Sequence, residues 1–184
     1  MPDPRKPIGV GIVGLSATGG WAAGAHLPAL RTVDGIELRA LAASSEASAQ
    51  TAGAAYGVPA YTSVEQLAGD TNVDLVVVAV KVPRHRELVL PVLKTGVPVL
   101  CEWPLAVDLH EAEEMERAAG TTRTFVGLQG RSSPTFRWLA DLVSEGFVGG
   151  TCSPPPSWRL RPNGALRCPR TWSTRSTASS GPRC

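Results

Sequence analysis

Runs of aliphatic and β-branched residues alternate with helix-forming segments along the first 145 residues of the chain. The clearest run lies at 74–80 and is typical of a strand that is buried on both faces of a parallel sheet. Strands are predicted at 8–13, 36–43, 60–62, 74–80, 97–101 and 124–128, and helices at 20–32, 46–56 and 84–95 and from Ser63, Asp108 and Ser133. This alternation predicts an α/β fold with a doubly wound parallel sheet.

A glycine-rich turn follows the first predicted strand and leads into the helix at 20–32. Gly14, Ser16 and Gly19 occupy the three positions of a G-x-G-x-x-G pattern, with serine in place of the middle glycine. Such a turn can bind phosphate, because the N–H groups at a helix N-terminus lack intrahelical partners and the helix dipole favours an anion. The pattern therefore predicts a Rossmann-like nucleotide site. An ordinary tight strand-to-helix turn is the alternative.

The composition is that of one globular domain. With 184 residues, 43% of them hydrophobic and 18% charged, the chain is long enough for a single core and hardly for two. No apolar run approaches the roughly 20 residues that span a bilayer, and the N-terminus lacks the apolar region of a signal peptide. We therefore expect a cytoplasmic protein without membrane contact.

The segment at 150–184 differs in composition from the rest. Residues 151–184 contain six arginines and no acidic residue, a charge of +6, whereas the first 150 residues have 12 basic and 16 acidic side chains, a charge of −4. The acidic body argues against nucleic-acid binding. Because the tail has almost no apolar residues, it is predicted to be disordered, and its composition suggests translation out of frame. A functional basic tail that binds an acidic partner is the alternative.

The cysteines do not form a metal-binding pattern. Cys101 ends a predicted strand and is interpreted as a small buried hydrophobic residue, while Cys152, Cys168 and Cys184 lie in the tail. None has C-x-x-C spacing or a histidine at zinc-ligand spacing. No metal site is predicted.

The residues that follow each strand are the candidates for ligand contact, because ligands bind beyond the carboxyl ends of the strands of such a sheet. NAD-specific sites place an acid at the end of the second strand, where it accepts hydrogen bonds from the ribose hydroxyls. Here Ser44 and Ser45 occupy that place, and Glu46 is expected to start the next helix. Without the acid, repulsion of a 2′-phosphate is relieved, so NADP is slightly favoured over NAD. In the alternative, the serines only cap the helix.

Several motifs follow one another along residues 7–149: the glycine-rich turn, Val-Pro-Arg-His at 82–85, Glu-x-Pro-Leu-Ala at 102–106 and Gly-Leu-Gln-Gly-Arg-x-Ser-Pro at 127–134. With these motifs the chain resembles the glucose-fructose oxidoreductase / inositol dehydrogenase / MocA family, and within it the subgroup of the yeast galactose-regulon repressor. The resemblance implies a dinucleotide-binding domain at 1–149, followed in family members by a C-terminal α/β substrate domain. No sequence for that second domain is found, so we expect it to be missing.

Trp103 departs from the pattern of the hydride-transferring members. Those members have lysine at this position, beside the nicotinamide and the substrate, where an ammonium group can assist proton transfer. An indole offers one N–H donor and a stacking face but no accessible protonation chemistry. The resemblance therefore implies no catalytic residue in this chain. Trp103 either stacks near a nicotinamide ring or packs against the absent domain.

The resemblance also implies the cofactor contacts, position by position. His85 lies in a loop that borders the cofactor, with helix capping or surface exposure as alternatives, and His26 is interpreted as structural. Glu102 contacts a ribose or holds its loop, with a surface role as the alternative, and Gln129 follows the sixth strand on the substrate side. The candidate cofactor-binding residues are Gly14, Ser16, Ala17, Gly19, Gly20, Trp21, Ser44, Ser45, Lys81, Val82, His85, Glu102, Trp103 and Gln129.

By this resemblance the chain is the nicotinamide-dinucleotide-binding domain of an oxidoreductase that acts on sugar- or polyol-like substrates, inactive as given because the substrate domain is missing. The alternative is a non-catalytic, nucleotide-sensing regulatory module, comparable to the repressor subgroup, in which the nucleotide tunes an interaction with a protein partner. Trp103 and the imperfect glycine turn favour this alternative.

Overall fold

The computed structural model describes residues 6–147, which divide into two compact units. The first unit ends at Leu128 and the second begins at Gln129. The tail at 150–184, for which disorder and out-of-frame translation are predicted, lies outside the described residues, as does the predicted domain boundary at residue 149.

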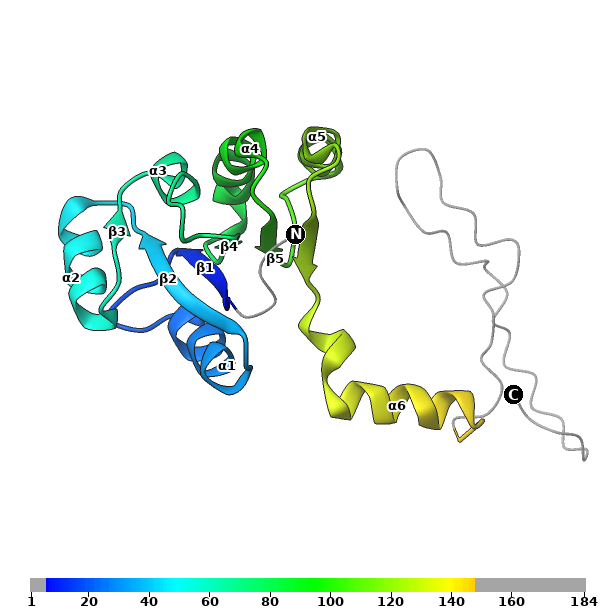
Figure 1. The fold of residues 1–184 in the computed structure, drawn as a ribbon. Coiled ribbons are helices and arrows are strands. Elements are labelled where there is room, and N and C mark those ends of the chain that lie inside the picture. Colours follow the sequence, from blue (N-terminus) through cyan, green and yellow to red (C-terminus); the bar gives the residue numbers. More distant parts are fainter. Residues whose placement is uncertain (1–5, 148–184) are drawn as a thin grey trace, which may run out of the picture. The chain divides into compact units, whose positions relative to one another are not determined.

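The first unit is built on one sheet of six parallel strands in the order β3-β2-β1-β4-β5-β6 (Figure 1). The strands are β1 (Ile8–Val13), β2 (Ile36–Ala42), β3 (Ala60–Tyr61), β4 (Leu75–Val78), β5 (Val99–Glu102) and β6 (Thr124–Gly127). The chain builds outward from β1 to one edge, then returns to add β4 on the other side of β1. The doubly wound parallel sheet predicted from the sequence is confirmed.

Helices join the strands. They are the π-helix η1 (Ala22–His26) with α1 (Leu27–Thr32), α2 (Glu46–Tyr56), α3 (Val64–Ala68), the 3-10 turn η2 (Val82–Arg84) with α4 (His85–Thr95), and α5 (Leu109–Ala119). In the second unit, the 3-10 turn η3 (Gln129–Ser132) precedes α6 (Pro134–Ser144). Within residues 6–147, every helix falls short of a membrane-spanning segment in length or in apolar character.

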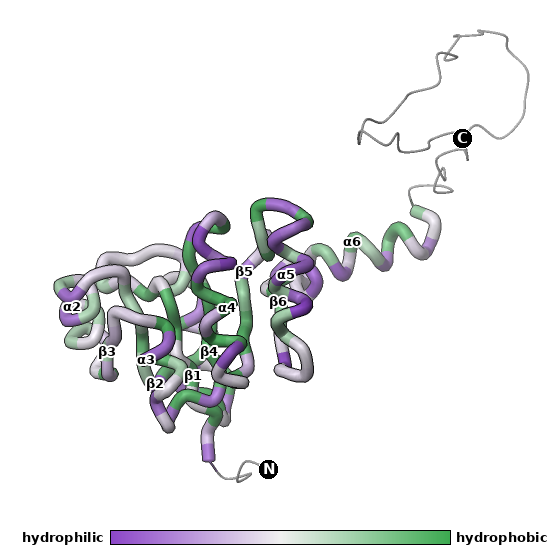
Figure 2. The backbone as a smooth tube through the Cα atoms, turned by 90° about the horizontal axis from the view of Figure 1, so that it is seen from above, coloured by the Kyte–Doolittle hydropathy of each residue, from purple (hydrophilic) through white to green (hydrophobic). Residues whose placement is uncertain are grey.

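Two apolar clusters fill the two faces of the sheet, because successive side chains of a strand point to opposite faces. Val10 and Ile12 pack with residues of η1, α1 and α2, whereas Val13 packs on the other face with α3, α4 and α5. In β4, Val77 packs in the same cluster as Val10 and Ile12, whereas Val76 and Val78 pack in the cluster of Val13. Figure 2 shows the apolar strands at the centre and mixed polarity along α4 and α5. Burial on both faces explains the unbroken apolar run of β4.

Local hydrogen bonds set several element boundaries. Asp108 caps α5 as predicted, accepting from the backbone N–H of Glu111 at 2.9 Å, while the Glu111 carboxylate accepts from the N–H of Val107. The strand expected at 74–80 ends at Val78, and the carbonyl of Val80 contacts the ring of His85 instead of a neighbouring strand. The chain therefore leaves the sheet early after β4.

Candidate functional site

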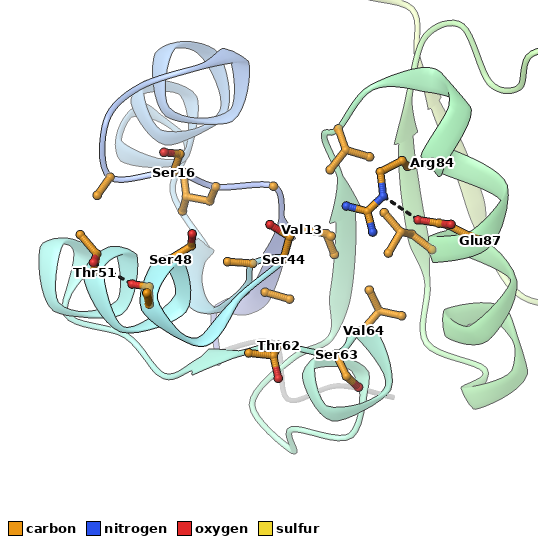
Figure 3. A pocket seen from close by; sticks show the side chains of 18 of the residues that line it. Val13, Ser16, Ser44, Ser48, Thr51, Thr62, Ser63, Val64, Arg84 and Glu87 are labelled. Atoms are coloured by element: carbon orange, nitrogen blue, oxygen red, sulfur yellow. Dashed lines mark hydrogen bonds and ion pairs between the residues drawn. The ribbon is translucent and has the colours of Figure 1, made fainter.

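A cavity of about 860 Å³ opens at the carboxyl ends of β1, β2 and β4 (Figure 3). Its walls come from the turn after β1, the first turns of α2 and α3, and the start of α4. The lining residues are Val13–Thr18, Ala42–Ser44, Ala47, Ser48, Thr51, Thr62–Glu65, Val80, Arg84, Glu87 and Leu88. The cavity therefore lies at the point where the strand order reverses, the usual ligand site of such sheets.

Gly14 is required by the geometry of the turn after β1. Its φ is +90°, and a Cβ atom there would lie 2.6 Å from both the carbonyl oxygen of Ala79 and a side-chain carbon of Val80. Only glycine fits a positive φ and so close an approach. The turn thus packs directly against the end of β4.

Ser16, at the position of the middle glycine, is held within the turn. Its hydroxyl accepts from the backbone N–H of Thr18, and its carbonyl accepts from the N–H of Gly19 and from the hydroxyl of Tyr56 at 2.7 Å. The helix that follows begins at Ala22 with no side-chain cap. The turn is thus fixed by its own hydrogen bonds and by Tyr56, and the serine does not close the cavity.

The two serines after β2 have different roles. Ser44 lines the cavity. Ser45 caps α2 instead: its hydroxyl accepts from the backbone N–H of Ser48 at 3.3 Å and donates to the Ser48 hydroxyl. The capping alternative is therefore correct for Ser45, and Ser44 remains the candidate for ligand contact.

Sequence reasoning misses the polar residues that α3 and α4 bring to the cavity. Glu65 accepts a hydrogen bond from the Ser63 hydroxyl at 2.7 Å, and this bond holds the pKa of the Glu65 carboxyl below its usual range. Arg84 donates from Nε to Glu87 Oε1 at 2.6 Å. An arginine and an acid three residues apart are neighbours on a helix, so this spacing is a signal that the sequence offers.

His85 is fully buried, which excludes the exposed alternative. Nε2 lies 3.0 Å from the carbonyl oxygen of Val80, and Nδ1 lies 3.1 Å from that of Leu105. Carbonyl oxygens only accept, so both contacts are hydrogen bonds only when the ring carries both N–H groups. The side chain joins the end of β4 to the loop that carries Trp103, and any effect of His85 on a ligand passes through these two segments.

Glu102 is also buried, at 7% exposure, so its surface role is excluded. Its Oε1 lies 2.7 Å from Nε2 of His26, which links the end of β5 to the last turn of η1. A Cβ atom at Gly127 would lie 2.9 Å from the Glu102 carboxylate, so glycine in β6 makes room for this side chain. The contacts favour a role for Glu102 in holding its loop.

Of the predicted cofactor-binding residues, Gly14, Ser16, Ala17 and Ser44 line the cavity. Those that do not line it are Gly19, Gly20, Trp21, Ser45, Lys81, Val82, His85, Glu102, Trp103 and Gln129. Trp21 and Trp103 are exposed, at 52% and 62%, and Gln129 belongs to the second unit. Lys81, Val82 and Trp103 follow β4 and β5, so they stay candidates for contacts beyond the cavity.

Cys101 is buried, as predicted, and burial raises the pKa of its thiol to about 12, with a further contribution from the Glu102 charge. At neutral pH its thiolate fraction is then about a thousandfold lower than that of a thiol with the ordinary pKa. We expect iodoacetamide to leave Cys101 unlabelled in the native protein and to alkylate it after unfolding in guanidinium chloride, as measured by peptide mass mapping. Rapid native labelling would contradict this.

Among residues 6–147, no three His, Cys, Asp or Glu side chains are arranged to hold a metal ion.

A parallel sheet in this strand order, with a glycine turn after β1 and a cavity at the switch point, defines a Rossmann-type dinucleotide-binding domain. The sequence profile of the oxidoreductase family with an NAD-binding Rossmann fold (GFO_IDH_MocA) matches residues 8–128. The chain belongs to this family, as the sequence motifs predict.

Its relatives include both enzymes and regulators. It is 38% identical to dehydrogenase aclE of Aspergillus oryzae over 78% of this chain and 42% of that protein. It is 33% identical to the galactose/lactose metabolism regulatory protein GAL80 of Saccharomyces cerevisiae, over 78% of this chain and 36% of that protein. The chain thus spans about two-fifths of the length of the relatives that it matches.

The solved structures that resemble this chain also include a regulator and an enzyme. A super-repressor mutant of Gal80p from Saccharomyces cerevisiae superposes with a TM-score of 0.69 at 31% identity, over 78% of this chain and 40% of that chain. A mutant of the 3-ketoreductase KijD10 from Actinomadura kijaniata, in complex with TDP-benzene and NADP, also has a TM-score of 0.69 at 27% identity. The match covers 78% of this chain and 46% of that chain.

Proposed function

We propose that this chain binds a nicotinamide dinucleotide whose adenosine half occupies the 860 Å³ cavity. The carrying observation is the position of the cavity between the Gly14 turn, the end of β2 and the start of α4, at the switch point of the sheet. The missing Cβ of Gly14 lets the turn pack against the carbonyl of Ala79 at the end of β4, and this contact holds the turn at the edge of the cavity. The residues present therefore fit the group that the family binds.

In this proposal the turn at 14–19, next to the start of η1, would hold the pyrophosphate. Lys81, Val82 and Trp103, which follow β4 and β5, would hold the nicotinamide end of the ligand. When bound, that ring supplies hydride-transfer chemistry. The chain's own residues orient it: His85 joins the two loops that flank it, and Glu102 fixes the end of β5.

We favour NADP slightly over NAD as the cofactor. No acid stands at the end of β2, and the Ser44 hydroxyl faces the cavity there. Hydroxyl groups and an arginine suit a 2′-phosphate, and Arg84 lines the same cavity.

We infer binding without turnover for this chain, because Trp103 stands where the family resemblance implies a lysine in the hydride-transferring members, and an indole has no acid–base group that titrates near neutral pH. A whole protein of this type would act on a sugar- or polyol-like substrate. A second candidate is a regulatory module whose bound nucleotide tunes a protein interaction. The exposed Trp103 and the likeness to GAL80, a regulatory protein, support this second candidate.

Titration with NADP and NAD tests the proposal. Both ligands are expected to quench tryptophan fluorescence, because Trp21 and Trp103 flank the assigned ligand path, and calorimetry is expected to give a single site. A flat response to both ligands up to millimolar concentration would refute binding. A parallel assay follows nicotinamide reduction by absorbance with inositol and glucose. No signal is expected, and sustained reduction would overturn the inference of binding without turnover.

A further inference from the structure

We propose that Arg84 and Glu87 form a selectivity pair in the cavity, in which Arg84 is the counter-charge for a 2′-phosphate and Glu87 competes with that phosphate for Arg84. This inference rests on the proposed dinucleotide binding and names the residues that set the choice between NADP and NAD. Neither residue lies on the loop after β2 where the acid of NAD-specific sites is placed.

The geometry places the pair on the wall formed by the start of α4. Both residues line the cavity, and Figure 3 shows the Arg84 guanidinium turned into it, with Glu87 farther along the helix. The two side chains are about half exposed, at 51% and 55%, so their ion pair is solvated and opens at small cost. Glu87 also lies in the first turn of α4, where the helix dipole stabilises its charge without Arg84.

Hydroxyl groups from other elements line the same cavity as Arg84. Ser44 and Thr62 come from the ends of β2 and β3, and Figure 3 shows both beside the cavity. The hydroxyls of Thr51 and Ser63 are used within the protein, donating to the carbonyl of Ala47 and to Glu65. Ser44 and Thr62 are therefore the better placed donors for a ligand oxygen.

The charges of the lining residues explain why selectivity depends on this pair. Among the described residues that line the cavity, Arg84 is the cation, and Glu65 and Glu87 are the acids. NADP differs from NAD at the adenosine by a phosphate that brings about −1.5 to −2 charges. When Arg84 turns to the phosphate, Glu87 loses its partner, so the gain is partly cancelled. Removal of Glu87 should therefore strengthen binding of NADP alone.

Dissociation constants of NADP and NAD, measured by calorimetry for E87Q, R84Q and the parent chain, test the pair. We expect E87Q to tighten NADP binding about two- to fivefold, the worth of an exposed ion pair, and R84Q to weaken it about tenfold, with NAD changed less than about twofold in both. R86Q is the matched control. Arg86 lies on the same helix and pairs with Glu114 at 2.6 Å, but it does not line the cavity, so both constants should stay unchanged.

The outcomes separate this inference from the proposed function. If the parent chain binds neither dinucleotide, the proposed function fails. If it binds them and R84Q shifts both constants equally or neither, Arg84 does not bind the 2′-phosphate. If E87Q leaves NADP affinity unchanged, Glu87 is not a competitor. Either of the last two results overturns the selectivity pair while dinucleotide binding stands.

Discussion

Substitution of Gly14 by alanine is expected to abolish dinucleotide binding and to lower the free energy of unfolding by about 2–5 kcal/mol. The new Cβ would lie 2.6 Å from the carbonyl oxygen of Ala79, a backbone atom that moves only with the end of β4. The positive φ of +90° adds the strain of a left-handed conformation. Relief of the clash should move the turn away from β4, and with it the backbone N–H groups that we propose bind the pyrophosphate.

Gly35→Ala is the matched control for this substitution. Gly35 has a φ of +78°, but a Cβ atom there would meet nothing within 4 Å beyond its chain neighbours, and the residue does not line the cavity. The variant should lose about 1–2 kcal/mol from strain alone and keep its affinity for dinucleotide. Urea unfolding followed by circular dichroism gives the stabilities, and calorimetry of the folded variants gives the affinities. Equal effects of the two substitutions would show that contact with β4 is unimportant.

The fold is predictable from the sequence because its signal is local. A strand buried on both faces needs consecutive apolar residues, and β4 and its neighbours have them. The ends of strands are less predictable, since they depend on distant partners. Glu102 extends β5 by one residue beyond the prediction, because Gly127 of β6 leaves space for its side chain. No local pattern in residues 97–101 contains that information.

Some residues of the candidate site are predictable from the sequence and others are not. Gly14 and Ser44 are predictable because they follow strands with strong signals. Thr62 and Glu65 escape prediction although a strand at 60–62 and a helix from Ser63 are predicted, because the sequence does not show that this edge of the sheet borders the cavity. The motif around His85 predicts a cofactor contact. The His85 ring is instead buried against the carbonyls of Val80 and Leu105, which lie five and 20 residues away in the sequence. Only the folded chain brings these three residues together.

Replacement of His85 by leucine, a side chain of similar size, is expected to cost about 1–3 kcal/mol of stability for each buried carbonyl that is left without its donor. A neutral ring donates to one of the carbonyls of Val80 and Leu105 and a doubly protonated ring to both, so at least one hydrogen bond is lost. His85→Gln, which can donate from its amide, should recover part of the loss. His110→Leu, at an exposed position of α5, is the control and should change stability by no more than about 0.5 kcal/mol.

The same variant also tests whether His85 acts on the site or only on the core. Leu105 lies two residues from Trp103, so release of its carbonyl frees the loop that carries the indole. At a urea concentration where the variant is still folded, its tryptophan emission should shift and dinucleotide affinity should fall at least severalfold. If His85→Leu loses stability but binds dinucleotide like the parent, the residue only fills the core. If the variant loses neither stability nor dinucleotide affinity, the two carbonyl contacts do not hold these loops together. A buried hydrogen-bond donor that can be deleted without cost contributes nothing to stability.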